Sequence, residues 1–161
     1  MNITSIISNK NKTIIFIVRC CVLMFMFISH ISAKAQTENL TVITNTKGAP
    51  AELKFIDLKS ILMGEKQRWR NGNKIMIALM KTNTSGGNSI CKKIYDMSSD
   101  ELKKFWLALV FDGKSDGPVF LNSAAEVQSY VAENPGAIGV IDQQQETADI
   151  HIVLIDGKKT F

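Results

Sequence analysis

The stretch TNTSGG, which begins one residue after Lys81, combines hydroxyl-bearing side chains with two glycines. It lies between an apolar run typical of a buried strand and a run typical of a helix. At a helix start, backbone N–H groups lack intrahelical partners and the dipole is positive, so an anion can bind there. A candidate oxyanion site therefore consists of the charge of Lys81, the hydroxyls of Thr84 and Ser85, and the N–H groups of Ser85, Gly86 and Gly87. We expect the two glycines to permit close approach of the backbone and a positive φ.

The same stretch has a second interpretation that requires no ligand. Ser85 or Asn88 could cap the following helix by accepting a hydrogen bond from a backbone N–H group. In an open α/β sheet, such a loop also lies at the edge where ligands bind. The residues of the loop alone leave both interpretations open.

Few other residues have types and spacings suited to chemistry. Asp96, Asp100 and Glu101 are close in sequence, but the helix dipole alone favours acids in a first turn. Cys91 fits a small buried hydrophobic residue, and His151 lies inside a strand-like run. These are the only cysteine and histidine after residue 35, whereas structural zinc takes about four ligands. We therefore expect a protein that is not an enzyme and that uses no metal and no cofactor.

The first 35 residues have the layout of a secretory signal peptide. A basic region that ends at Arg19 is followed by an apolar core at residues 20–31 and by small residues at Ala33 and Ala35. The apolar core is about half the roughly 20 residues that a membrane-spanning helix needs. We therefore expect cleavage after Ala35, a periplasmic or secreted location and no stable membrane anchor afterwards.

The charge balance gives no support for a nucleic-acid partner. The chain of 161 residues has 19 basic and 15 acidic residues. The predicted leader contains four of the basic residues and no acid, so residues 36–161 carry 15 of each and no net charge. The basic stretch at residues 65–74 contains one aromatic residue, Trp69, whereas nucleic-acid grooves combine positive charge with several stacking aromatics. We interpret this stretch as a solvated loop that Trp69 anchors.

Residues 36–161 are enough for one modest core, and strand-like and helix-like segments alternate along them. Strands are predicted at residues 40–45, 73–81, 137–142 and 149–156. Helices are predicted at residues 52–64 and 88–95, and after two capping boxes, Ser98 with Glu101 and Ser123 with Glu126. The strongest helical periodicity is that of Leu102, Phe105, Trp106, Leu109 and Val110, which predicts a core-facing stripe with Trp106 and Leu109 in the core.

This order of elements predicts an α/β fold with a central, mostly parallel sheet flanked by helices. The strand at 73–81 is apolar on both faces, as in a sheet covered on both sides. We expect the strands at 40–45 and 73–81 to be joined by a right-handed crossover through the helix between them. The last two strands could pair with each other, or the last could reach back to the centre of the sheet.

Three segments resemble phosphate-type periplasmic substrate-binding proteins, the type II binding proteins of ATP-binding-cassette (ABC) importers. LKSILMGEKQRWRNGNKIMIALMK resembles a segment in which a helix and a glycine turn lead through a Trp-bearing loop to a strand. SSDELKKFWLALVFDGK and VQSYVAENPGAIGVID resemble later helix-and-turn segments of that family, and NPGAIGV is the most specific part. The resemblance extends over roughly residues 40–156, nearly the whole predicted mature chain.

The resemblance also concerns the candidate site. In phosphate binders of this family, a Ser-Gly-Thr loop opens a helix and hydrogen-bonds the oxyanion. Ser85 and Gly86 match that loop, whereas Gly87 replaces the threonine and removes a hydroxyl donor. Lys81 stands near the position of an arginine and offers a point charge instead of a bidentate fork.

The resemblance implies one α/β lobe of a type II periplasmic-binding-protein-like fold, because members have two lobes and residues 36–161 suffice for one. Charge-assisted hydrogen bonds of about 1.5–3 kcal/mol each must offset an association cost of several kcal/mol. We expect an affinity of about 1 mM. The implied function is binding of phosphate or a similar oxyanion for ABC-type uptake or sensing, with an ABC permease or another envelope protein as partner. The alternative is an interaction module without a ligand that docks on an envelope protein complex.

Overall fold

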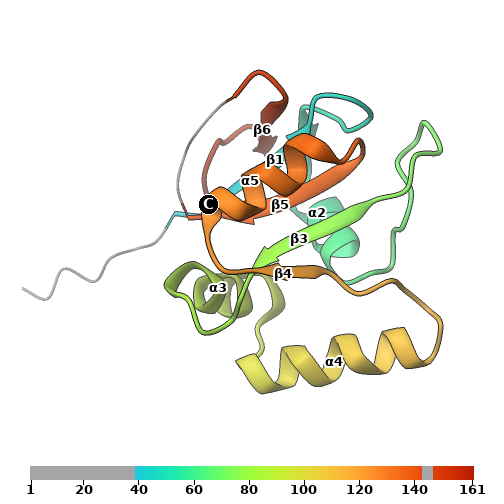
Figure 1. Cartoon of the computed structure of the whole chain (residues 1–161), viewed down its shortest axis with the longest axis vertical. Helices are drawn as coiled ribbons and strands as arrows, with labels where there is room; N and C mark the ends of the chain where they lie inside the picture. The colour runs from blue at the N-terminus through green and yellow to red at the C-terminus, as the bar shows by residue number, and fades with distance from the viewer. Residues whose placement is uncertain (1–38, 143–146) are drawn as a thin grey trace, which may run out of the picture. The chain divides into compact units, whose positions relative to one another are not determined.

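The structure is a computed structural model that describes residues 39–142 and 147–161 (Figure 1). The predicted leader and its cleavage site lie outside the described residues. The described residues belong to one compact unit, which spans Glu38–Phe161.

Six strands form one sheet in the described part of the chain, in the order β2-β6-β1-β5-β3-β4. Their bounds are β1 Thr41–Asn45, β2 Glu52–Leu53, β3 Met76–Met80, β4 Val119–Leu121, β5 Ala137–Ile141 and β6 Ile150–Ile155. Strand β3 runs parallel to both of its neighbours, β4 and β5. Strand β1 runs antiparallel to β5 and to β6, and β2 is parallel to β6. The predicted α/β architecture is confirmed, with an antiparallel strand inside it.

The predicted crossover between the strands at 40–45 and 73–81 is wrong. Strand β5 lies between β1 and β3, parallel to β3 and antiparallel to β1, so β1 and β3 run in opposite directions. The handedness rule applies only to parallel strands. The long connection between the helix at Phe55–Leu62 and β3 lets the chain enter β3 from the opposite end of the sheet. The parallel neighbours β3 and β4 are instead joined through three helical segments. The last two strands both pair with β1 instead of with each other.

Helices cover both faces of this sheet. They are α2 Phe55–Leu62, α3 Ser85–Ile90, α4 Ser99–Phe111 and α5 Ala124–Glu133, and α3 continues directly into a π-helical turn, η2 Cys91–Tyr95. Figure 1 shows α5 in front of the sheet, α2 behind it, and α4 along the bottom, beyond β4. Residues 52–53, predicted as helix, form β2, and the helix predicted from residue 88 begins at Ser85.

Two serine caps begin α4 and α5. The capping box of Ser98 and Glu101 is complete, with the bond from the Ser98 N–H to the Glu101 carboxylate at 2.8 Å. Ser123 accepts from the backbone N–H of Glu126, as predicted, but the Glu126 carboxylate bonds to the N–H of Asn122 instead of closing a box. The side-chain amide of Asn122 donates to the same carboxylate, and these two bonds hold the Glu126 side chain at Asn122 instead of at Ser123.

The core is built around β1 and β5, which are buried at every position. Leu102 and Trp106 of α4 are buried, as the periodicity predicts, and Leu109 packs against the core while remaining half-buried. Val110 is different: 47% of it is exposed, so its predicted place on the core-facing stripe is wrong. The helix surface that contacts the core is narrower than the apolar stripe in the sequence.

Candidate functional site

Three loops meet at one edge of the sheet, because β4, β3 and β5 are adjacent and parallel. The segment called here the loop after β3 comprises residues 81–84 and the first residues of α3, 85–87. The loop after β4 begins at Asn122, and β5 is followed by Asp142. The carboxyl ends of parallel strands are the usual ligand-binding edge of an α/β sheet. The topology therefore brings the predicted loop to this edge.

Thr84 organises the loop after β3. Its Oγ1 accepts a hydrogen bond from the Gly87 N–H at 3.0 Å and donates one to the Lys81 carbonyl oxygen at 2.7 Å. The Thr84 N–H also donates to the Lys81 carbonyl, at 2.9 Å. Thr84 is thus the N-cap of α3, and the alternative in which Ser85 or Asn88 is the cap is wrong. The Thr84 hydroxyl and the Gly87 N–H are both used within the protein.

The two glycines are needed for close packing. A Cβ on Gly87 would overlap the carbonyl of Lys81, and one on Gly86 would overlap the end of the Met80 side chain. Neither residue has a positive φ, so the expected left-handed backbone is wrong. Because both glycines belong to a right-handed helix that sits directly on the end of β3, space and not backbone freedom excludes a side chain.

The charges around the loop are mixed. The exposed Lys81 ammonium donates to the Asn122 side-chain oxygen at 2.7 Å, so it points toward the loop after β4. Asp142 places a carboxylate oxygen 2.8 Å from where a Cβ of Gly86 would lie. An anion at the start of α3 would therefore have the ammonium of Lys81 nearby and, beside Gly86, a carboxylate.

A shallow pocket of about 370 Å³ adjoins the loop. Its lining residues are Lys81, Thr82, Asn83, Lys103 and Phe120. A larger hollow of about 820 Å³ lies elsewhere, beside Trp69 and the loop after β1. Acidic and basic residues line the larger hollow in equal number: Glu52, Asp57, Asp156, Lys54, Lys66 and Arg70. This balance gives it no preference for an anion, so the strand-end loops remain the better candidate despite their smaller pocket.

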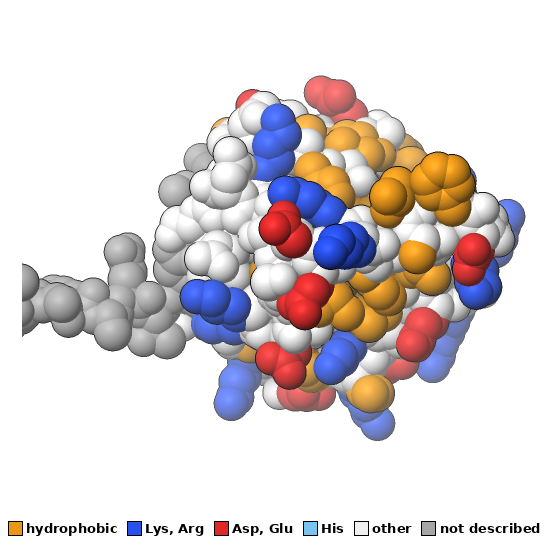
Figure 2. Space-filling model, turned by 90° about the horizontal axis from the view of Figure 1, so that it is seen from below, with side chains coloured by type: hydrophobic (Ala, Val, Ile, Leu, Met, Phe, Trp, Pro, Cys, Tyr) orange, Lys and Arg blue, Asp and Glu red, His pale blue; other side chains and the backbone are white. Residues whose placement is uncertain are grey.

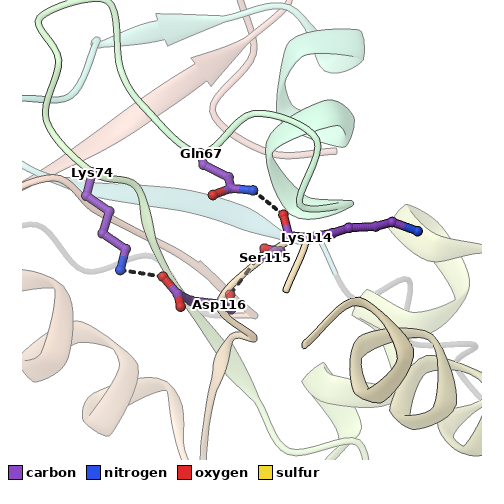
Figure 3. Close-up of polar contacts among 5 residues, drawn as sticks. All are labelled: Gln67, Lys74, Lys114, Ser115 and Asp116. Atoms are coloured by element: carbon purple, nitrogen blue, oxygen red, sulfur yellow. Dashed lines mark hydrogen bonds and ion pairs between the residues drawn. The ribbon is translucent and has the colours of Figure 1, made fainter. Parts of the chain in front are cut away.

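The basic stretch at 65–74 has a structural role, as predicted. The Trp69 side chain is buried, and its Nε1–H donates to the Gly136 carbonyl at 2.8 Å. Figure 3 shows that this stretch also holds the loop after α4, through an ion pair between Lys74 and Asp116 and a hydrogen bond from the Gln67 amide to the Lys114 carbonyl. These contacts fix the chain that follows α4.

Cys91 and His151, the cysteine and histidine considered for chemistry, lie in different environments. Cys91 is buried, as predicted, and burial raises the pKa of its thiol, which keeps it protonated. His151 is exposed in β6, opposite Thr44 of β1. Within residues 39–142 and 147–161, the acidic, histidine and cysteine side chains form no group of three or more that could hold a metal ion.

No protein-family model matches the sequence, and no curated protein matches it. Several solved structures share its fold. The chain is similar to a candidate phosphate ABC transporter substrate-binding protein with bound phosphate from Clostridium perfringens, with a TM-score of 0.58 and 15% identity. It is also similar to PstS from Borrelia burgdorferi, at 0.53 and 19%, and to an ABC-type phosphate transport receptor from Vibrio cholerae, at 0.59 and 14%.

These similarities cover 74%, 74% and 76% of this chain, and 46%, 48% and 48% of the three proteins in the same order. The chain thus spans about half the length of the structures it matches. At these identities the similarity shows the fold, and it confirms the predicted α/β fold of the periplasmic-binding-protein type. No helix in the described residues combines the length and the apolar character needed to cross a membrane.

Proposed function

We propose that this domain binds a small oxyanion of the phosphate class at the loop after β3, without catalysing a reaction, as a substrate-binding component for ABC-type uptake or sensing. The observation that carries this proposal is the position of the loop. It begins a helix at the shared carboxyl edge of three parallel strands, in a fold found in solved proteins described as phosphate-binding or phosphate-transporting.

Within the loop, we assign the anion contacts to Ser85, Gly86 and Lys81. Thr84 and Gly87 complete the cap of α3, so their role is to shape the loop and to seat the helix on β3. The helical dipole extends over α3 and η2, which are continuous from residue 85 to residue 95. The Lys81 ammonium can approach the anion by replacing its exposed hydrogen bond to the Asn122 side chain with one to the anion.

Asp142 gives the proposed site a preference between oxyanions. Its carboxylate beside Gly86 repels any anion, but it can accept a hydrogen bond from an anion that keeps a proton. Hydrogen phosphate carries such a proton at neutral pH, whereas sulfate does not. We therefore expect phosphate to bind more tightly than sulfate, although both have the same tetrahedral shape.

Nuclear magnetic resonance titration of the loop amides tests the site directly. Addition of phosphate to tens of millimolar should shift the amide signals of residues 85–87, in line with an expected affinity of about 1 mM. Sulfate at the same ionic strength should shift them less. If the loop amides stay unshifted throughout the phosphate titration, the isolated domain has no such site.

Ser85→Pro is the variant best suited to this titration. Ser85 is the first residue of α3, and Thr84 before it has ψ of 160°, so a proline fits without breaking the helix. The change removes both the hydroxyl and the N–H of Ser85 and should abolish the phosphate-dependent shifts. Ser99→Pro is the matched control, because it is the first residue of α4 after a serine with ψ of 164°. Gly86→Val is unsuitable, since its side chain would collide with Met80.

The location and the transport partner are also part of this proposal. A leader that is removed after Ala35 would deliver residues 36–161 to the periplasm or the exterior, where an ABC permease or another envelope protein can meet them. N-terminal sequencing of the exported protein should begin at Gln36. Recovery of the protein with Met1 still attached in a membrane fraction would contradict the cleavage.

A second candidate function, that of an interaction module, is favoured by one observation. Helix α4 exposes Leu107, Val110 and Phe111 on the surface of the domain. Exposed apolar patches on soluble domains commonly mark contacts with other macromolecules. Retention of a native fold and loss of every phosphate-dependent shift would favour this function over anion binding.

A further inference from the structure

Helix α4 has two apolar faces, and only one of them packs against the domain. Leu102 and Trp106 on the inner face are 1% and 3% exposed. On the outer face, Leu107, Val110 and Phe111 are 58%, 47% and 81% exposed. Spacings of three and four place these three side chains on one stripe of the helix. Figure 2, which views the molecule from the side of α4, shows hydrophobic side chains interleaved with charged ones.

Charged residues flank this outward stripe in an ordered way. Asp100 lies seven residues before Leu107, and Lys114 lies seven residues after it, in the turn that follows the helix. Lys103 lies on the same side of α4, between Asp100 and the apolar residues. The stripe therefore begins with an acid and has apolar residues after its centre. Helix α4 ends at Phe111 and the chain turns at Gly113, so Lys114 lies just beyond the end of the stripe, in the turn.

We propose that this outward stripe of α4 packs against the same stripe of a second copy of the chain, with the two helices antiparallel and a twofold axis near Leu107. A twofold interface requires a surface that complements itself, so that when residue i contacts residue j, j also contacts i. Antiparallel pairing about Leu107 satisfies this condition. It brings Leu107 against Leu107 and Lys103 against Phe111, and it places Asp100 next to the turn that carries Lys114 of the other copy.

The pairing suits each of these contacts chemically. The Lys103 side chain can lay its methylene groups along the Phe111 ring and place its ammonium at the ring face. Asp100 and Lys114 carry opposite charges, and the dipoles of antiparallel helices also attract each other. A parallel pairing would instead bring Asp100 against Asp100 and Lys114 against Lys114. The charge pattern therefore selects the antiparallel arrangement.

The ion pairs that these residues form within one chain do not oppose the pairing. Lys103 bonds to Asp100 at 3.3 Å and Lys114 to Asp112 at 2.8 Å, and the side chains of all four are more than half exposed. Such surface pairs contribute little to stability and can be exchanged. The backbone of Lys114 is held by Gln67 while its side chain points away from that contact (Figure 3), which fixes the site from which its charge projects.

A second copy fits the stripe better than a lipid surface does. Amphipathic helices that lie on membranes have a polar face rich in Lys and Arg, which attracts anionic lipids. Helix α4 contains two acids, Asp100 and Glu101, and two lysines, Lys103 and Lys104, so its charged side chains balance. This balance gives no electrostatic attraction to a membrane, but it suits an interface whose charges pair across a twofold axis.

Sedimentation velocity of the exported protein over a range of concentrations tests the proposal. We expect a monomer–dimer equilibrium that Phe111→Glu weakens by at least about tenfold, because it places a charge inside the apolar contact. Ala125→Glu is the matched control: Ala125 is exposed on a different helix, α5, so the equilibrium should be retained. A protein that stays monomeric at every concentration, or a dimer that Phe111→Glu leaves intact, overturns the proposal.

Two further measurements test the antiparallel register. Asp100→Lys and Lys114→Asp should each weaken the dimer, and the double variant should restore it, because the swapped charges pair again across the axis. Leu107→Cys should give a disulfide-linked dimer on mild oxidation, whereas Ala125→Cys on α5 should not. If the double variant is weaker than both single variants, or if Leu107→Cys fails to cross-link while a dimer is present, this arrangement is wrong.

Discussion

Asn45 ties the end of β1 to the end of α5. Its side-chain amide donates to the carbonyl oxygens of Val131 and Ala132 at 2.9 and 2.8 Å, and its side-chain oxygen accepts from the Lys47 N–H at 2.8 Å. The residue is 2% exposed. These carbonyls belong to the last turn of the helix, where backbone acceptors lack intrahelical partners. Asn45 thus serves as a C-terminal cap supplied by a distant strand.

Asn45→Ala should lower the free energy of unfolding by about 2–4 kcal/mol. The change leaves buried carbonyl groups without donors, and each such group costs about 1–3 kcal/mol. Urea unfolding measures the loss. Asn71→Ala is the control, because Asn71 donates to the Gly48 carbonyl at an exposed position and should contribute little. Equal effects of the two substitutions would mean that the buried hydrogen bonds of Asn45 contribute no more to stability than the exposed one of Asn71.

Cys91 should react with thiol reagents only when the domain unfolds. It is 1% exposed, and burial raises the pKa of the thiol, so the reactive thiolate is rare and shielded in the folded state. Mass spectrometry after iodoacetamide treatment should find Cys91 unmodified in native buffer and fully modified in urea. Rapid modification of the native protein would contradict the burial of η2 against the core.

At the residue scale, sequence predicts the chemical types at the candidate site better than their roles. The loop after β3 could be found because hydroxyl and glycine residues follow an apolar run. The choice of Thr84 as the cap could not, because three neighbouring residues have side chains capable of capping. Asp142 was missed because it lies far along the chain, and only the parallel pairing of β5 with β3 brings it beside Gly86. An acid as the last residue of the strand predicted at 137–142 was the available signal.

The capping box at the start of α4 should give the domain a measurable dependence on acid. Hydrogen bonds from Ser98, first from its backbone N–H, lower the pKa of the Glu101 carboxyl from its ordinary value of 4.5. A carboxyl group whose pKa is lower in the folded state than in the unfolded state stabilises the fold at pH values above its unfolded-state pKa. This contribution is lost as the pH falls through the folded-state pKa. Stability of the wild type relative to Glu101→Gln should therefore decrease from neutral pH to about pH 3.

Equilibrium unfolding at several pH values checks this prediction. Glu101→Gln keeps an acceptor for the cap but cannot titrate, so it isolates the charge. A constant difference between the two proteins from pH 7 to about pH 3 would show that the carboxylate charge has no role in the cap.

The two faces of α4 should differ sharply in their effect on stability. Trp106→Ala on the inner face should destabilise the domain by about 3–5 kcal/mol, because it removes a large buried ring. Leu107→Ala, one residue further along, should cost less than about 1 kcal/mol in dilute solution, since Leu107 is 58% exposed. Thermal unfolding compares the two. Similar losses would mean that α4 is rotated from its position in the structure.

At the element scale, the sequence located the helices and four of the six strands of the described residues. It missed β4, assigned β2 to a helix, and did not predict which strands are neighbours. The apolar spacing of α4 predicted the helix and its buried Trp106, yet the same apolar residues continue onto a second face, and Val110 belongs to that one. Sequence cannot tell which of two apolar faces a domain will cover. The direction of β1 could not be predicted from the sequence either, because it depends on pairing with β5 and β6, which come much later in the chain.

At the scale of the whole molecule, ligand binding should appear as a gain in stability. A site with a dissociation constant near 1 mM, exposed to about 100 mM phosphate, stabilises the folded state by about 2.7 kcal/mol. For a domain of this size, that gain raises the melting temperature by about 10 °C.

Phosphate also stabilises proteins without binding at a site, because it is excluded from their surfaces. Ser85→Pro separates the two effects, since it removes contacts at the start of α3 and leaves the rest of the surface unchanged. The wild type should therefore gain several degrees more than Ser85→Pro at equal phosphate. The difference should shrink when sulfate replaces phosphate, because sulfate has no O–H group that could donate a hydrogen bond to the Asp142 carboxylate. An equal rise in both proteins would show that phosphate acts on the surface as a whole and that the loop after β3 binds no anion.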